Sequence, residues 1–367
     1  MAINGHFVID CVTHAFDLRP ENEKGLYAHQ MNEANFQLQH AYLDDPYRLS
    51  RERYFQAFDA EALASALFLE SDTDVAFYHT IPAWGVWNDY SPIRIGMEIR
   101  DRYPGRMFCY GAVSPLQGKK AVEDLEKQVA EWDIYGVKFY PVDFIDGVMQ
   151  SFLMSDKQHC YPVFEKCREL GLKTVAIHKS LPLGGAAMDP FRPGDVDYAA
   201  MDFPDLNFEI VHGGYAFLEE TCHQIARFDN VYVNLEVNTA LILRQPRAFA
   251  KMLGDLLLHG EDQLFWGTGA MFVHPAPVLE AFANFQFPED MIEGYGYPEL
   301  TDEIKGKILS GNFARMHGLD VHELARNIED DEISRVRARG DAPDAWDRLP
   351  ANGDVAAAGH QEAAQHG

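Results

Sequence analysis

The chain has 367 residues, 47% of them hydrophobic, and its formal net charge is -26 at pH 7. This length provides a sizeable core. The acidic surface repels phosphate backbones and anionic membranes, so neither nucleic acid nor a membrane is an expected partner. No apolar run approaches the ~18 residues of a membrane-spanning helix. The first residues, MAINGHFVID, lack the basic and apolar regions of a signal peptide.

Cysteine usage indicates a reducing compartment. The number of cysteines is odd, no two form a CxxC pair, and most lie in apolar stretches typical of strands or helices. Free thiols in a cytoplasmic protein are therefore expected, rather than a disulfide framework. The five are Cys11, Cys109, Cys160, Cys167 and Cys222.

Eight short apolar runs alternate along the chain with longer segments of helical period. They repeat at about the length of one βα unit, with no hairpin signal between them, which indicates parallel pairing. Eight parallel strands with interleaved helices favour a closed (β/α)8 barrel of the α/β class over an open sheet. The runs are residues 7–12, 74–79, 107–113, 136–140, 174–178, 208–212, 231–235 and 264–268.

Three of the intervening segments predict helices with clear ends. Residues 119–132 place apolar side chains at helical spacing on one face. Residues 161–170 end at Gly171, a natural C-cap, and residues 249–258 end at a His-Gly pair. A cation-capable residue followed by glycine is typical of a helix C-terminus.

Two segments do not fit the repeat. Residues 16–58 form a long insertion after the first strand, rich in aromatic and acidic residues, and such a loop is usually functional or at an interface. Residues 328–367 begin with an acidic run and end in a low-complexity sequence. The barrel is therefore predicted to span residues 1–327, followed by a tail that is disordered or docks as an arm on a neighbour.

Histidines follow several predicted strands at the end where a parallel barrel carries its active site. His178 and His212 each end a hydrophobic strand, and one βα unit separates them. Adjacent parallel strands lie about 4.8 Å apart, so these two side chains can reach one metal ion. His14 follows the first strand and supplies a third imidazole. Core or capping histidines are the alternative, but three at one rim favour a metal site.

Six motifs in order resemble the amidohydrolase superfamily, specifically the amidohydrolase-related branch that includes aminocarboxymuconate semialdehyde decarboxylase. The resemblance runs from residue 7 to about residue 320. The motifs are IDCVTH at 9–14, GVKFYP at 136–141, AIH at 176–178, VHGG at 211–214, LFWGTG at 264–269 followed by His274-Pro275, and ILSGNFARMHGL at 308–319.

The resemblance implies a metal in the barrel mouth that activates a water molecule or polarises the substrate. It implies ligands from an HxH after strand 1, a histidine after strand 5, often one after strand 6, and an aspartate after strand 8. This chain departs from that pattern twice. Val12 stands at the first histidine position and Gly269 at the aspartate position, and neither side chain can ligate or act as a base.

The remaining residues suggest how a site is still built. His14, His178 and His212 are expected to hold a divalent ion, most simply zinc, with iron or manganese as alternatives. Asp10, at the family's first acidic position, is expected to ligate or to orient His14. Glu236 is a candidate to replace the lost catalytic groups.

Four further groups carry alternatives. His274 is a second candidate catalytic replacement. His79 either orients a metal-ligating residue or is a packed core histidine. Lys138 would ligate a second metal if carboxylated, although pairing with an acid is the simpler expectation. Trp84, Trp87 and Tyr90 form either a pocket wall or an interface, with the interface slightly favoured.

The two lost ligands lead to the prediction of a degenerate site in a companion subunit, working beside a paralogous barrel in a hetero-oligomeric metalloenzyme. The branch contains non-haem metal-dependent monooxygenases, and one two-component hydroxylase of the small amino acid 2-aminoisobutyrate pairs a catalytic barrel with a partner that this chain resembles. Two alternatives stay open: an active mononuclear hydrolase or decarboxylase of a small carboxylate, and a non-catalytic scaffold.

Overall fold

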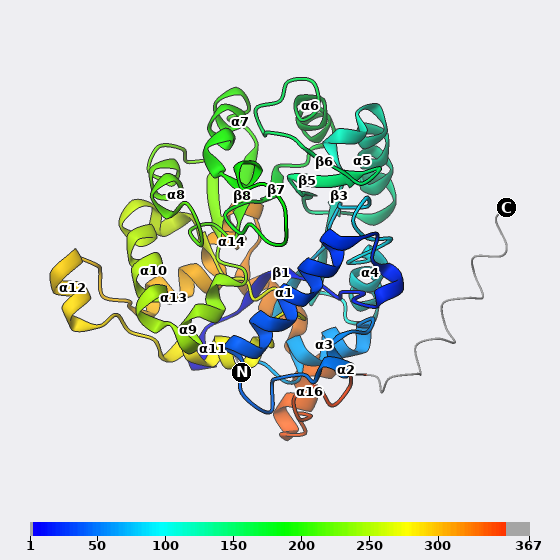
Figure 1. Ribbon diagram of the computed structural model, residues 1–367. Helices are drawn as coiled ribbons and strands as arrows, with labels where there is room; N and C mark the ends of the chain where they lie inside the picture. Colours follow the sequence, from blue (N-terminus) through cyan, green and yellow to red (C-terminus); the bar gives the residue numbers. More distant parts are fainter. Residues whose placement is uncertain (1–2, 350–367) are drawn as a thin grey trace.

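The computed structural model describes residues 3–349 and shows a barrel of eight parallel strands surrounded by helices (Figure 1). The strand order is β1-β2-β3-β4-β7-β8-β9-β10. The barrel closes where β1 meets the segment after β10, since the Cys11 amide donates to the Trp266 carbonyl and the Gly269 amide to the Val12 carbonyl. The strands are β1 (Ile9–Thr13), β2 (Val75–His79), β3 (Met107–Ala112), β4 (Val137–Phe139), β7 (Thr174–His178), β8 (Asn207–Val211), β9 (Val231–Asn234) and β10 (Leu264–Phe265).

All eight predicted runs overlap one of these strands, so the predicted (β/α)8 barrel is confirmed. One hairpin was missed. Strands β5 (Val142–Ile145) and β6 (Val148–Ser151) pair antiparallel beside the barrel. Asp146 and Gly147 connect them with positive φ angles of 54° and 74°, which an Asp-Gly pair adopts readily in a tight turn.

Helices cover the outer face of the barrel, as the amphipathic segments predicted. The predicted helix 119–132 is α5 (Lys119–Trp132), the segment 161–170 is α6 (Tyr161–Leu170), and residues 249–258 lie within α10 (Pro246–Gly260). Gly171 ends α6 with φ 77°, the left-handed conformation that glycine adopts without strain. The other barrel helices are α3 (Ala60–Phe68), α4 (Ile93–Arg102), α7 (Val196–Asp202), α8 (Leu218–Ile225), α9 (Leu241–Arg244), α11 (Pro275–Asn284), α12 (Glu289–Tyr295), α13 (Asp302–Gly306) and α14 (Asn312–His317).

The insertion forms the roof of the barrel mouth. Its long helix α1 (Leu26–Tyr42) lies across the carboxyl ends of the strands (Figure 1), and the short helix α2 (Arg51–Tyr54) follows it. Met31, Asn35 and Leu38 of α1 line a cavity beneath the helix. The insertion is therefore part of the barrel mouth, and five of its eight aromatic residues are buried.

Residues 328–349 pack on the barrel, in contrast to the expectation of a segment without a core. The final helices are α15 (Val321–Ile328) and α16 (Glu332–Arg339). Arg337 of α16 donates to the carbonyls of Phe68, Ser71 and Thr73, and Trp346 is 2% exposed. Residues 350–367 lie outside the described residues, so the docking arm stays a prediction.

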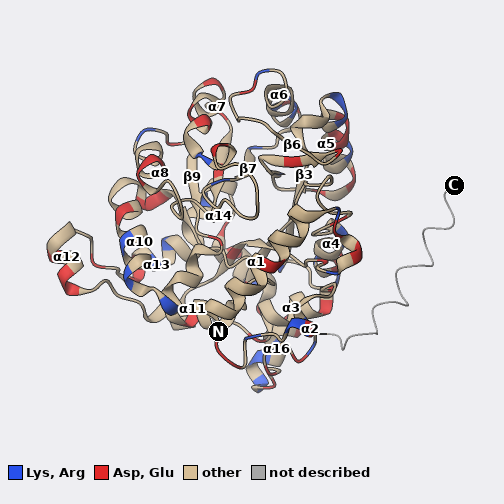
Figure 2. Ribbon diagram, in the orientation of Figure 1, with Lys and Arg blue, Asp and Glu red and all other residues tan. Residues whose placement is uncertain are grey.

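Charged side chains of both signs lie on the outer helices, with acidic residues in excess (Figure 2). Among the described residues, no helix has both the length and the apolar character needed to cross a membrane.

All five cysteines are free and buried. Burial raises the pKa of each thiol, which keeps the thiols protonated at neutral pH. We therefore expect a thiol-specific reagent to modify the native protein at least roughly tenfold more slowly than the urea-unfolded chain. Counting modified thiols over time checks this, and one fast-reacting native cysteine would contradict it.

Candidate active site

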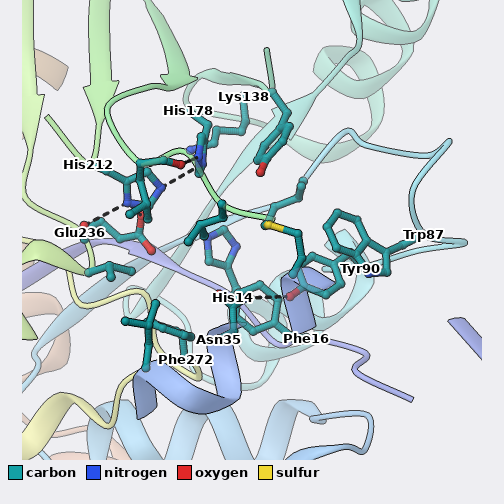
Figure 3. Close-up of a pocket in the computed structure, with 17 residues that line it drawn as sticks. His14, Phe16, Asn35, Trp87, Tyr90, Lys138, His178, His212, Glu236 and Phe272 are labelled. Atoms are coloured by element: carbon teal, nitrogen blue, oxygen red, sulfur yellow. Dashed lines mark hydrogen bonds and ion pairs between the residues drawn. The ribbon is translucent and has the colours of Figure 1, made fainter. Parts of the chain in front are cut away.

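A cavity lies at the carboxyl ends of the strands, beneath α1 (Figure 3). Its walls are apolar and largely aromatic, and its polar groups come from five different strand ends. The wall residues include Phe16, Met31, Leu38, Ile81, Trp87, Tyr90, Tyr140, Leu181, Leu183, Val237 and Phe272, and the polar groups include His14, Lys138, His178, His212 and Glu236. A largely apolar chamber with a few converging polar groups is typical of a small-molecule site.

His178 and His212 form the centre of the polar group. Nε2 of His212 lies 2.9 Å from Nδ1 of His178 (Figure 3). His178 ends β7, and His212 directly follows β8, the neighbouring strand. His212 has φ 65°, a conformation that non-glycine residues rarely adopt. Such backbone strain is often concentrated at functional sites.

Hydrogen bonds fix one nitrogen of each imidazole as a donor. Nδ1 of His14 lies 2.7 Å from the His79 carbonyl oxygen, and Nε2 of His178 lies 2.8 Å from the Leu181 carbonyl oxygen. Nδ1 of His212 lies 3.1 Å from the Glu236 carbonyl oxygen. Since these oxygens only accept hydrogen bonds, each of these nitrogens carries a proton, which leaves the opposite nitrogen free to present a lone pair.

Burial supports the neutral form of two of these imidazoles. It lowers the pKa of His14 to about 4. It also lowers the pKa of His178 well below its usual value, with a further contribution from His212. At neutral pH both rings therefore have an unprotonated nitrogen, which is the form that binds a metal ion.

The facing nitrogens of His178 and His212 need a positive species between them. With their other nitrogens protonated, two lone pairs would otherwise meet at 2.9 Å. Either a proton on His212 or a cation between the rings removes this repulsion. A metal-ligating histidine commonly donates its second N–H to a carbonyl or a carboxylate, and all three histidines do so here.

Glu236 occupies the space opposite Gly269. Its Oε2 lies 2.8 Å from Nδ1 of His212. A Cβ atom built at Gly269 would overlap Oε1 of Glu236 and lie 3.1 Å from its Cδ. Burial alone raises the pKa of the Glu236 carboxyl, but the nearby His212, with smaller contributions from His14 and Lys138, holds it below its usual value. The family pattern has an aspartate at position 269, where this chain has glycine. The Glu236 carboxylate, which follows β9, thus fills the space beside that glycine.

The donor set fits a divalent metal in its chemistry. Three imidazoles have their tautomers fixed for coordination by backbone carbonyls, and the Glu236 carboxylate lies beside one of them. Two of the donor nitrogens already face each other. In the part of the chain that the structure describes, however, no three His, Cys, Asp or Glu side chains converge as a ready ligand set.

Lys138 lies in the cavity without the acidic partner that the sequence suggested. It is 2% exposed and forms no hydrogen bond or ion pair with any other described residue. Burial lowers its pKa to about 8, although Glu236 and Glu209 oppose this shift.

Two predicted site residues do not reach the cavity. Asp10 accepts hydrogen bonds from the backbone and hydroxyl of Thr268, so it joins β1 to the segment after β10. Nε2 of His274 lies 2.9 Å from Glu70, and its Nδ1 accepts from the Ala276 amide at the start of α11. The expectations that Asp10 ligates and that His274 is catalytic are therefore revised, because both side chains are saturated by structural partners.

The other sequence candidates lie as follows. His79 is buried against Tyr110, with ring centroids 4.2 Å apart, and supports His14 through its backbone carbonyl. Trp87 and Tyr90 stack on each other and line the cavity, so the pocket alternative applies to them. Trp84 is only half-buried and lies outside the cavity.

Several residues of the cavity wall were not predicted from the sequence. Phe16, Asn35 and Phe272 come from loops or from the insertion, and Asn35 donates to the Tyr90 hydroxyl at 3.2 Å. No motif marks them. Only the aromatic composition of the insertion hinted that it covers the site.

Comparisons with known proteins place these features in a family. Residues 9–319 match the amidohydrolase family. A search of curated protein sequences found no match. Among solved structures, an uncharacterized TIM-barrel protein from Bordetella bronchiseptica is 18% identical, with a TM-score of 0.58 over 85% of this chain and 99% of that chain.

Two further similar structures are decarboxylases. A 2,6-dihydroxybenzoate decarboxylase from Rhizobium is 16% identical, with a TM-score of 0.55 over 85% of this chain and 99% of that chain. A 5-carboxyvanillate decarboxylase from Novosphingobium aromaticivorans, solved with bound manganese, is 14% identical, with a TM-score of 0.54 over 86% of this chain and 98% of that chain. At these identities the likeness shows the fold alone.

Proposed function

This chain belongs to the amidohydrolase family, and from that premise we propose that it is a metal-dependent enzyme that decarboxylates a small carboxylic acid with an apolar body. The observation that carries the proposal is the His178–His212 pair, whose facing nitrogens Nδ1 and Nε2 lie 2.9 Å apart in a largely apolar cavity. Hydrolysis of a similar carboxylate is the related alternative, because the same groups would serve it.

His178 and His212 would hold the metal, with His14 as a third donor. Zinc suits this imidazole set, and iron or manganese also bind imidazole with carboxylate. When bound, the ion would polarise the substrate carboxylate or activate a water molecule. Manganese is named for the carboxyvanillate decarboxylase, which supports a divalent ion in this chain too.

The protein's own groups would orient the reactants and exclude water. The backbone carbonyl of Glu236 accepts the hydrogen bond from Nδ1 of His212, which fixes that ring toward His178, and the Glu236 carboxylate lies 2.8 Å from the same nitrogen. Phe16, Trp87 and Tyr90 enclose the apolar body of the substrate, and α1 separates the chamber from solvent. Exclusion of water strengthens every electrostatic interaction inside the chamber.

Neither the comparisons nor the site geometry favours the predicted degenerate companion subunit. Several of the similar structures are decarboxylases, and Glu236 supplies a carboxylate despite the glycine at 269. A paralogous partner in a monooxygenase stays a prediction. The exposed Leu26, Val148 and Met188 near the hairpin and roof are where such a partner would bind. Copurification of a second barrel from the native source tests it.

The metal proposal is tested by counting ions per chain. We expect about one divalent ion in the wild-type protein purified without a chelator, and at least roughly tenfold weaker retention in His178→Ala and in His212→Ala. His274→Ala is the matched control, because that buried histidine lies outside the cavity and should leave the metal content unchanged. Equal metal content in all four proteins would contradict the site.

The reaction is tested on metal-loaded protein. Release of carbon dioxide from small aromatic carboxylates, including 2,6-dihydroxybenzoate and 5-carboxyvanillate, is the expected result, and His178→Ala should abolish it. A metal-loaded protein that releases no carbon dioxide from any of them but copurifies with a second barrel would instead favour the companion subunit.

A further inference from the structure

Lys138 is a buried lysine without a partner in a chain that pairs its other buried lysines. Lys179 donates to Asp195, and Lys305 donates to the Ala283 carbonyl. Lys138 is 2% exposed, and within residues 3–349 its amine forms no hydrogen bond or ion pair. A buried polar group without a protein partner lowers stability unless a ligand satisfies it. This lysine is therefore expected to serve a ligand of the cavity that it lines.

The strand register places the lysine beside the histidine pair. Lys138 of β4 is level with Ala112 of β3 and Ala176 of β7, so no large side chain stands on either side of it. His178 follows Ala176 by two positions on β7 and therefore projects to the same face. Figure 3 shows the lysine and the two histidines at one side of the cavity and Trp87 at the other.

The acids nearest in charge to this amine are turned to other partners. Glu209 and Glu236 both act on it electrostatically. Glu209 accepts hydrogen bonds from Asn234 and Tyr110, and the Glu236 carboxylate lies 2.8 Å from Nδ1 of His212. Neither acid forms a hydrogen bond or an ion pair with the amine, so its three N–H donors stay available to a ligand.

The ligand that suits this amine is an anion. An ammonium group has donors only, so its partner must accept hydrogen bonds. A buried charge is costly unless an opposite charge lies beside it. Of the described residues that line the cavity, Lys138 is the one lysine or arginine, so it marks where the anionic end of a ligand lies. A carboxylate fits, because charge-assisted hydrogen bonds are roughly twice as strong as neutral ones.

We infer that Lys138 binds the carboxylate of the substrate and so determines the preference of the cavity for small acids over their neutral analogues. The inference deepens the proposed function and rests on it for the identity of the anion. The carboxylate then lies next to His178 and His212, and the apolar body lies against the aromatic wall. No covalent bond forms or breaks in this step.

Calorimetric titration of the full-length protein as purified tests this inference, with benzoate and benzamide as probes. The two molecules have nearly the same shape, but only benzoate is charged. We expect the wild-type protein to bind benzoate at least roughly tenfold more tightly than benzamide. Lys138→Met should weaken benzoate binding at least roughly tenfold and change benzamide binding by less than about twofold, whereas Lys138→Arg should keep the preference for benzoate. Samples of equal measured metal content are compared.

Urea unfolding of the same variants distinguishes ligand binding from a structural role. Lys138→Met should raise the midpoint, because an apolar side chain of similar length replaces an unpaired buried charge. The matched control Lys305→Met removes a buried lysine that is hydrogen-bonded outside the cavity, so it should lower the midpoint and leave benzoate binding unchanged. A lower midpoint with unchanged benzoate binding in Lys138→Met would make Lys138 structural and overturn the inference.

The outcomes also separate this inference from the proposed decarboxylation. A wild-type protein that does not prefer benzoate overturns the inference without any variant. A preference for benzoate that Lys138→Met loses supports it even where no carbon dioxide is released. Release of carbon dioxide with an unchanged KM in Lys138→Met would leave the decarboxylation standing and overturn the role of Lys138.

Discussion

Gly269→Asp is expected to destabilise the protein by on the order of 3 to 5 kcal/mol, even though it restores the residue that the family pattern places there. Two effects add up. The new Cβ would overlap Oε1 of Glu236, and overpacking of a buried site costs about 1–3 kcal/mol. In addition, Gly269 has φ 68°, where a non-glycine residue is strained by about 1–3 kcal/mol. Urea unfolding of the variant and the wild type measures the difference.

A second glycine separates the two effects. Gly318 has nearly the same φ, 67°, but a Cβ built there would meet nothing within 4 Å. Gly318→Asp therefore reports the backbone strain alone and should cost about 1–2 kcal/mol. The remainder measured at Gly269 is assigned to the overlap with Glu236.

The double variant Glu236→Ala with Gly269→Asp completes the test. Removing the Glu236 carboxylate makes room for the aspartate, so the double variant should be more stable than the sum of the two single changes by about 1–3 kcal/mol. Additive single effects would contradict the idea that one carboxylate has taken the place of the other. Metal content of the double variant then shows whether an aspartate at 269 supports the same site.

The replacement of a carboxylate at position 269 by that of Glu236 explains why the sequence predicted a degenerate site. Val12 and Gly269 were compared with the family pattern one position at a time, and each comparison showed a loss. The compensation lies on a different strand, since Glu236 follows β9 and Gly269 follows β10. Only the folded barrel brings the two positions into contact, so no local motif reveals it. Glu236 was identified as a candidate from its strand-end position alone.

The barrel itself and the histidine pair were predictable because both depend on local signals. Apolar runs of strand length mark the β-strands, and His178 and His212 follow directly after two of them. His274 carried the same kind of signal beside a proline, yet it caps α11 and pairs with Glu70. Sequence spacing cannot distinguish a helix cap from a catalytic group, because both favour polar side chains at the end of a loop.

The C-terminal segment was misjudged for a related reason. Its acidic start suggested a segment without a core of its own, but one of those acids, Asp331, pairs with a buried cation of the barrel, and Arg337 of α16 pairs with a barrel acid. Nη2 of Arg106 donates to Oδ1 of Asp331 at 2.9 Å, and Arg337 lies 3.3 Å from Asp74. Composition gives the sign of a segment's net charge but not the location of its ion-pair partners. Here those partners are more than 200 positions away in the chain.

Removal of Asp331 is therefore expected to be costly. Arg106 has a fully buried side chain, and among the described residues Asp331 is the one carboxylate within ion-pair distance of it, while Asp74 acts on it from farther away. Asp331→Ala should lower the free energy of unfolding by on the order of 3 kcal/mol, because it removes the ion-pair partner of a buried guanidinium and the N-cap of α16. Burial raises the pKa of the Asp331 carboxyl, but Arg106 outweighs burial and holds this pKa below its usual value. The ion pair therefore stabilises the fold at neutral pH, and this contribution is lost as acid protonates the carboxyl.

Two controls divide this effect into its parts. Asp331→Asn keeps a side chain that can cap α16 but loses the charge, so its cost relative to Asp331→Ala should be smaller by about 1 kcal/mol. Asp341→Ala removes the acid of an exposed pair with Arg339 and should change stability by less than about 1 kcal/mol. If Asp331→Ala proved as mild as Asp341→Ala, the C-terminal helices would contribute little to the stability of the barrel. A large loss of stability in Asp331→Ala would instead make residues 328–349 an integral layer of the fold.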